Sequence, residues 1–149
     1  MCIRDSEYTG VTLKPNELEG LRAVGNRNDP KKATLEDLFE CAKALSVQNK
    51  SGVCMTLGEK GCVTVEEGKI VYIPSYEVPS PLDTCGAGDT FLAAFACSKA
   101  AAAEIFEAAA FANLAANVTI KKIGTTGTAS QREIKIRHNQ IFGLKEQNE

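Results

Sequence analysis

Residues 83–90, with the sequence DTCGAGDT, combine acidic and very small side chains and run directly into an apolar helical pattern. Gly86, Ala87 and Gly88 have almost no side chain, so a ligand can approach their backbone closely. The first N–H groups of a helix lack intrahelical partners and lie at the positive end of the helix dipole, where phosphate groups bind. The spacing therefore predicts an anion hole at these three residues, with the carboxylate of Asp89 inside it.

A carboxylate beside an anion hole suits the removal of a proton from a bound hydroxyl group. Transfer of a phosphoryl group to an alcohol needs both of these functions. The alternative is a capped helix start, in which Asp83 or Thr84 accepts backbone hydrogen bonds and the glycines only form the turn. Capping explains neither the second aspartate, Asp89, nor the presence of both glycines, so the sequence favours phosphoryl transfer.

The segment resembles the C-terminal signature Asp-Thr-x-Gly-Ala-Gly-Asp of the ribokinase-like, or PfkB, family of sugar kinases. Two more stretches are similar to elements of the same family, in the same order: residues 56–61 (TLGEKG) and residues 16–19 (NELE). Taken alone, the first is an ordinary glycine-rich turn and the second an Asn helix cap with a Glu at the third position. The resemblance implies roles in binding ATP and its phosphates for Thr56, Gly58, Gly61, Asn16 and Glu19.

The resemblance also implies the cofactors. Asn16 and Glu19 would order Mg²⁺ through water, and a K⁺ ion beside Asp83 stays open, with Cys85 contributing its carbonyl rather than its thiol. Asn113 would lie beside the nucleotide base. On spacing alone, Asn113 and Asn117 are one helical turn apart and could equally satisfy nearby backbone groups, so the role of Asn117 is undecided.

The activity implied is direct transfer of the γ-phosphoryl group of ATP to a hydroxyl of a sugar or sugar phosphate, without a covalent intermediate. Asp89 would accept the hydroxyl proton, and the N–H groups of residues 86–89 would stabilise charge on the transferred group. Residues 111–125 are most similar to kinases of heptose phosphates, which are often fused to an adenylyltransferase domain. Ribokinase, fructokinase and nucleoside kinase activities remain open.

The resemblance covers residues 11–128, which correspond to the C-terminal part of such a kinase. In the family, the N-terminal half grips the sugar, so we expect residues 1–149 to form a single partial domain that is inactive by itself. A homodimer of the full-length protein stays open. Two other classes remain as alternatives: a catalytically inactive nucleotide-binding remnant, and a Rossmann-type dinucleotide binder, whose Gly-x-Gly-x-x-Gly fingerprint after the first strand is absent.

Composition narrows the class of protein further. The 149 residues are 44% hydrophobic and 24% charged, which is typical of a globular domain. No apolar run approaches the ~20 residues of a membrane span, and a net charge of -2 with scattered basic residues gives no footprint for nucleic acid. We therefore expect no membrane and no nucleic-acid partner, and a cytoplasmic location. The six cysteines lack Cys-x-x-Cys spacing and are expected to be buried free thiols.

Hydrophobic periodicity predicts helices that alternate with buried strands. Strands are expected over residues 10–13, 53–57, 61–65 and 70–73, and helices over residues 17–24, 34–45, 88–101, 103–118 and 134–144, with a polar loop over 26–32. This order indicates the α/β class: a ribokinase-like layered fold, with helices on both faces of a Rossmann-like sheet. The candidate site residues should then converge on one cleft, because such sheets gather their loops at the carboxyl ends of their strands.

Overall fold

The computed structural model describes residues 9–26 and 32–143. Its centre is a three-stranded antiparallel sheet in the order β1 (Val53–Thr56), β2 (Cys62–Glu66) and β3 (Lys69–Ile73). Glu67 and Gly68 connect β2 to β3, and both have positive φ angles, of 51° and 79°. Such angles match the right-handed twist of a hairpin. The hairpin expected from the sequence is confirmed.

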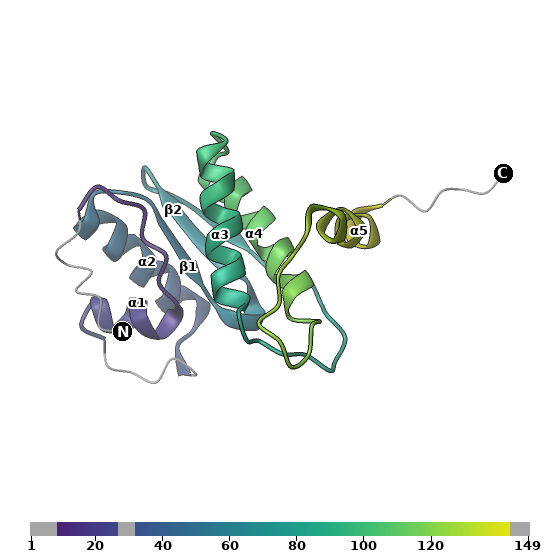
Figure 1. Ribbon diagram of the computed structural model, residues 1–149. Coiled ribbons are helices and arrows are strands. Elements are labelled where there is room, and N and C mark those ends of the chain that lie inside the picture. The colour runs from purple at the N-terminus through teal and green to yellow at the C-terminus, as the bar shows by residue number, and fades with distance from the viewer. Residues whose placement is uncertain (1–8, 27–31, 144–149) are drawn as a thin grey trace.

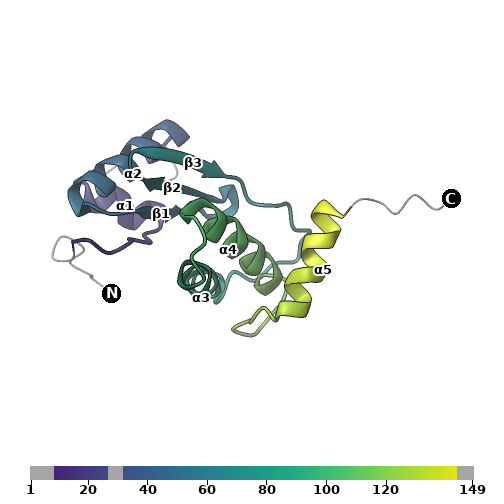
Figure 2. The same cartoon turned by 90° about the horizontal axis from the view of Figure 1, so that it is seen from above.

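Helices cover both faces of this sheet (Figures 1 and 2). One face carries α1 (Glu17–Ala23) and α2 (Leu35–Asn49), and the other carries α3 (Ala87–Ala100) and α4 (Ile105–Thr119). A last helix, α5 (Gln131–Phe142), lies to one side against α4, and a short 3-10 helix, η3 (Gly58–Lys60), follows β1. The α/β class and the layered arrangement are confirmed.

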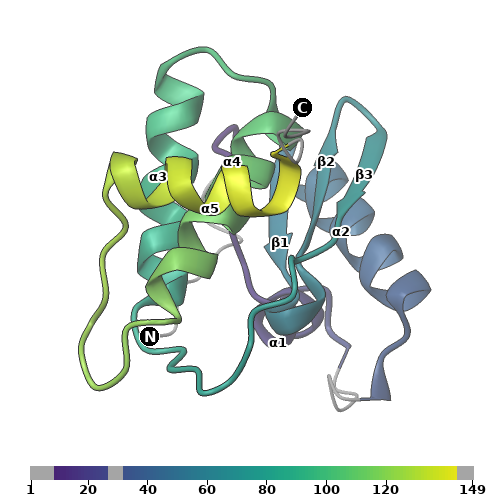
Figure 3. The ribbon, with the colours of Figure 1, turned by 90° about the vertical axis from the view of Figure 1, so that its right-hand side faces the viewer.

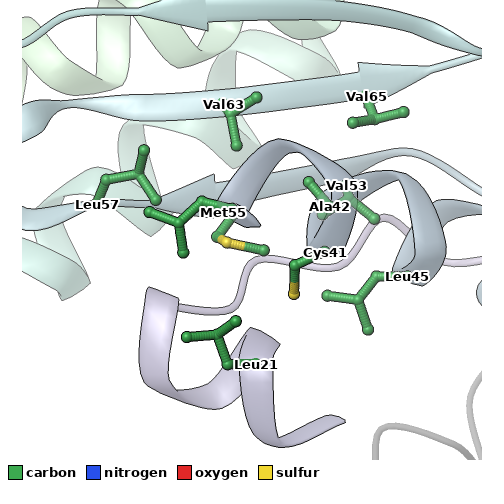
Figure 4. Packing of buried hydrophobic residues seen from close by; sticks show 10 residues of the cluster. Leu21, Cys41, Ala42, Leu45, Val53, Met55, Leu57, Val63 and Val65 are labelled. Atoms are coloured by element: carbon green, nitrogen blue, oxygen red, sulfur yellow. The ribbon is translucent and has the colours of Figure 1, made fainter. Parts of the chain in front are cut away.

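Side chains of β1 alternate between the two layers, because successive residues of a strand point to opposite faces. Val53 and Met55 pack with Leu21 and the buried face of α2 (Figure 4). Cys54 points the other way and joins the core beneath α3 and α4. A strand covered on both faces reads as a continuous apolar run, as residues 53–57 do.

The strand expected over residues 10–13 is wrong as a regular element. The backbone there makes isolated parallel bridges to β1, Leu13 to Val53 and Asn16 to Thr56. Leu13 donates its N–H to the carbonyl of Gly52, and the carbonyls of Leu13 and Pro15 accept from β1. Pro15 has no N–H to donate, so the ladder is interrupted before it becomes a strand.

Helix starts follow their caps closely. Thr34 and Asp37 form the capping box expected from the sequence. The last helix begins at Gln131 rather than 134, because Ser130 and Glu133 form a further capping box. Its expected end at residue 144 and most of the expected loop, residues 27–31, lie outside the described residues.

The cysteines in the described part of the chain are free thiols, but only some are buried: Cys41, Cys54 and Cys62 are, whereas Cys85 and Cys97 are exposed. Burial raises the pKa of the Cys41 thiol to about 11. Cys2 lies outside the described residues. No helix within residues 9–26 and 32–143 is long and apolar enough to cross a membrane.

Candidate active site

The predicted anion hole is an uncapped helix start. Gly86 precedes α3 with a φ of 77°, and a Cβ there would lie 2.9 Å from the methyl group of Thr126. The first bond of the helix runs from the N–H of Thr90 to the carbonyl of Gly86, at 2.9 Å. No side chain among the described residues caps this end. Asp83 does accept backbone hydrogen bonds, but from Cys85 and Gly124, which both lie outside α3, so it does not cap the helix. The first turn of α3 keeps N–H groups for an external anion.

Asp89 lies in that first turn and is exposed. Its carboxylate has no hydrogen bond or ion pair within residues 9–26 and 32–143. The other described aspartates differ, since Asp37 closes the capping box of α2 and Asp83 accepts two backbone hydrogen bonds. Asp89 is thus the described aspartate whose oxygens remain available to a bound hydroxyl group.

Asp83 joins the entrance of α3 to a loop far along the chain. Its carboxylate accepts from the N–H of Cys85 and the N–H of Gly124, each at 2.9 Å. These two bonds hold the pKa of the Asp83 carboxyl below its ordinary value, with Cys85 the larger cause. The N–H of Asp83 in turn donates to the carbonyl of Ile120 at 2.9 Å. Asp83 therefore positions the loop at residues 120–127 against the anion hole.

This contact predicts a pH dependence. Because the folded pKa of Asp83 is depressed, its stabilising effect is complete above the unfolded value, near 3.8, and is lost as the pH falls through the lower folded value. We expect the amide resonances of Cys85 and Gly124 to titrate together, with an inflection below pH 3.8, in NMR spectra. Asp83→Asn is the control, and should remove the inflection. A common inflection above that pH would contradict the assignment.

The elements with predicted phosphate and nucleotide roles meet at the end of β1. The backbone of Asn16 forms an isolated parallel β-bridge with Thr56, and the Thr56 hydroxyl donates to the carbonyl of Pro15 at 3.5 Å. Asn16 and Glu19 form a capping box on α1: the side chain of each accepts from the backbone N–H of the other, at 2.8 and 2.9 Å. The helix-capping role that the sequence left open for Asn16 and Glu19 is therefore present. Glu19 is exposed, and its second carboxylate oxygen remains available to a ligand.

The turn after β1 is closed by a bond from the N–H of Leu57 to the carbonyl of Gly61, at 2.8 Å. Gly58 and Gly61 have φ angles of 58° and 102°. A Cβ on Gly61 would lie 2.2 Å from the carbonyl oxygen of Ile73, so backbone packs directly on backbone. These glycines set the shape of the turn. At position 61 only glycine fits, because any Cβ would collide with the backbone.

Asn113 and Asn117 both serve their neighbours. The buried Asn113 donates to the carbonyl of Ile73 at 3.4 Å and to the sulfur of Cys62 at 3.6 Å. Asn117 donates to the hydroxyl of Ser75 at 3.4 Å and accepts from Arg137 of α5 at 3.2 Å. Asn113 binds the same Ile73 carbonyl that a Cβ on Gly61 would meet, so the structure brings these two predicted site residues close to each other.

These elements lie at one end of the sheet. Figures 1 and 3 show the start of α1, η3 and the start of α3 at the lower end of both views, with the loops at residues 74–86 and 120–130 beside them. The ammonium of Lys14, two residues before Asn16, lies 5.8 Å from the centre of the ring of Phe91, two residues after Asp89. The β1 end and the anion hole are thus neighbours.

Two cavities within residues 9–26 and 32–143 lie away from the cleft expected at this end. The larger, about 590 Å³, lies at the opposite end of the sheet, between α2 and the β2–β3 turn, and is lined by residues such as Lys50, Gly52 and Glu67. The second adjoins the same turn. We place the site by its chemistry, because neither cavity is lined by any of the predicted site residues.

The donor set fits magnesium bound mainly by phosphate and water. Among the described residues, no group of three or more His, Cys, Asp or Glu side chains gathers to hold a metal ion. Mg²⁺ usually binds through one or two carboxylates, water and substrate phosphates. The exposed Glu19 carboxylate, beside Asn16, can supply that share.

Sequence reasoning missed the hydroxyl groups behind the anion hole. The hydroxyl of Thr119 donates to that of Thr90 at 3.0 Å, and Thr90 donates to the carbonyl of Gly127 at 3.5 Å. The available signal was Thr119 itself, a polar residue at the end of an apolar helical run. Arg137, which donates to the carbonyl of Glu77 at 2.6 Å as well as to Asn117, left no such signal.

The fold of the chain is similar to that of solved sugar kinases. The ribokinase of Arabidopsis thaliana, complexed with ribose and ATP, matches with a TM-score of 0.73 and 26% identity over 85% of this chain and 40% of that chain. Escherichia coli phosphofructokinase-2, in complex with potassium, matches with a TM-score of 0.79 over 92% of this chain and 43% of that chain. At 21% identity, the second likeness shows the fold alone.

Relatives in sequence indicate the family of the chain. The bifunctional protein HldE of a Nitratiruptor species is 39% identical over 134 residues, which cover 87% of this chain and 27% of that protein. The chain spans 26% to 32% of the length of the first four curated relatives that it matches. The model of the family described as pfkB family carbohydrate kinase matches residues 11–132. The chain thus belongs to the pfkB family of carbohydrate kinases.

Proposed function

We propose that this chain is the nucleotide-binding and catalytic part of an ATP-dependent kinase that phosphorylates a hydroxyl of a sugar or sugar phosphate. The single observation that carries the proposal is the unpaired Asp89 carboxylate beside the uncapped start of α3. A base and an anion hole within one helical turn are what phosphoryl transfer to an alcohol requires. Membership of the carbohydrate kinase family supports it.

In this proposal Asp89 accepts the proton of the sugar hydroxyl as that oxygen attacks the terminal phosphorus of ATP. An alcohol is a far weaker acid than a carboxylic acid, so the proton moves late, as the new O–P bond forms. The N–H groups at the start of α3 stabilise the charge that spreads over the transferred group. Asn16 and Glu19 would hold Mg²⁺ through water, and that ion would neutralise the other phosphates.

Two details belong to the proposal. Heptose phosphate is the substrate class that we favour, because the resemblance in residues 111–125 is joined by several relatives with the name HldE. A monovalent cation beside Asp83 would have to share carboxylate oxygens that already accept the N–H groups of Cys85 and Gly124. Since the chain spans about a third or less of its relatives, the kinase activity is proposed for a longer polypeptide that contains it.

The test is an assay of ADP release by the full-length polypeptide with ATP and Mg²⁺. Heptose phosphate, ribose, fructose, fructose phosphate and a nucleoside serve as acceptors, each in KCl and in NaCl. We expect release with one acceptor class, and a KCl requirement if a cation binds. ATP binding by calorimetry, without ADP release in the presence of any acceptor, would favour the alternative of a catalytically inactive nucleotide-binding remnant. That alternative is tested because the chain matches only 27% of the length of its relative HldE. Absence of ATP binding would overturn the proposal.

A further inference from the structure

Two threonine hydroxyls connect three segments behind the anion hole. Thr119, the last residue of α4, donates its hydroxyl to Thr90 in the first turn of α3, and Thr90 donates to the carbonyl of Gly127. Thr119 is 0% exposed, so it touches neither solvent nor substrate. Thr90 directly follows Asp89. The hydroxyl chain therefore reaches the catalytic turn from inside the protein.

The loop at residues 120–127, which contains Gly127, also holds the segment that leads into α3. Asp83 binds this loop through the N–H of Gly124 and the carbonyl of Ile120. The backbone at Gly86 packs against Thr126, because a Cβ placed on Gly86 would lie 2.9 Å from the Thr126 methyl group. The loop at residues 120–127 thus supports the turn before the helix, and the hydroxyl chain supports the first turn of the helix itself.

The lack of a side chain at Gly127 explains why the loop backbone lies so close to Thr119 and Thr90. A Cβ on this buried glycine would lie 2.9 Å from the carbonyl oxygen of Thr119. The loop backbone can therefore approach the end of α4 directly, and its carbonyl reaches Thr90. Valine has the shape of threonine without the hydroxyl, so a site that needed only filling would not need threonine at both positions.

We propose that Thr119 is a positioning residue for the transfer step: through Thr90 it fixes the first turn of α3, and with it the Asp89 carboxylate and the adjacent N–H groups, against the loop at residues 120–127. The inference rests on the proposed kinase function and adds the support of its catalytic turn. Displacement of a catalytic group by a fraction of an ångström to one ångström lowers the rate of the chemical step more than the affinity for ATP.

The kinetic test compares hydroxyl removal with hydroxyl retention in the full-length kinase. Thr119→Val should lower kcat about 10- to 100-fold, with the KM for ATP within about threefold of wild type. Thr119→Ser keeps the hydroxyl and should restore most of kcat. Thr64→Val is the matched control, because Thr64 is also buried and donates its hydroxyl to the carbonyl of Val71, at 3.4 Å, within the sheet. It should lower the melting temperature but leave kcat unchanged.

Equal melting losses in Thr119→Val and Thr64→Val with unchanged kcat in both would overturn the proposal in favour of packing alone. If Thr119→Val does not fold, Thr90→Val and Thr90→Ser form the second set, because Thr90 joins Thr119 to the Gly127 carbonyl. Thr90→Val should lower kcat, and Thr90→Ser, which keeps the hydroxyl, should retain most of it. Unchanged kcat in a folded Thr90→Val variant would also overturn the proposal.

A second readout does not depend on kinase activity, so a failed proposed function stays distinguishable. Hydrogen exchange of the full-length polypeptide is followed by mass spectrometry in peptides that cover residues 86–92. We expect Thr119→Val to speed exchange there and Thr64→Val to leave it unchanged. Unchanged exchange in both variants would refute the support of the α3 turn, whatever the assay of ADP release shows.

Discussion

Asp89→Asn is expected to lower the kcat of the full-length kinase by about 10² to 10⁴-fold, the usual contribution of a positioned general base. Asparagine has nearly the same shape and keeps an oxygen, but it cannot take a proton from the sugar hydroxyl. The exposed position of Asp89 and its lack of partners among the described residues mean that no fold contact is lost there. ATP affinity, measured by calorimetry, should stay within about threefold of wild type.

Asp37→Asn is the matched control for this experiment. Asp37 occupies the same third position of its helix as Asp89, but its carboxylate accepts the N–H and hydroxyl of Thr34, at 2.8 and 2.7 Å. Its replacement should lower the melting temperature slightly through the weakened cap and leave kcat unchanged. A kcat of Asp89→Asn within about threefold of wild type would rule out its role as the base.

Gly61→Ala should have the largest effect on stability among the glycine replacements of the nucleotide turn. Its φ of 102° and ψ of -129° lie in a region that residues with a side chain rarely adopt. The new Cβ would also lie 2.2 Å from the Ile73 carbonyl oxygen and 2.5 Å from the Ser75 nitrogen, both rigid backbone atoms. We expect a loss of more than about 3 kcal/mol in the free energy of unfolding.

Gly68→Ala separates the conformational cost from the clash. Gly68 also has a positive φ, of 79°, but a Cβ there would meet nothing within 4 Å. Chemical denaturation should therefore show a loss of only about 1 to 2 kcal/mol for Gly68→Ala. Equal losses in the two variants would show that backbone strain alone, and not the contact with β3, makes Gly61 necessary.

Local patterns in the sequence determined much of this protein. The small residues of 86–88 predicted an uncapped, accessible helix start, because the absence of side chains is a property of the residues themselves. Thr34 with Asp37 predicted the start of α2, since a capping box involves only neighbours in the chain. The apolar run from Val53 predicted a strand with helices on both faces. The fold class followed from the order of these elements.

Contacts between distant residues were decided only by the tertiary structure. Asp83 and Gly124 are 41 positions apart, and Thr119 and Thr90 are 29 apart, so neither pairing leaves a periodic trace. Asn113 could face a ligand or the backbone, and packing of α4 on β3 directed it to the Ile73 carbonyl. Residues 10–13 have strand-like composition, yet a strand needs a partner with a complete ladder. Pro15 interrupts that ladder, because it has no N–H group to donate to β1. The missing N–H group has this effect only where the tertiary structure places a neighbouring strand that would accept its hydrogen bond.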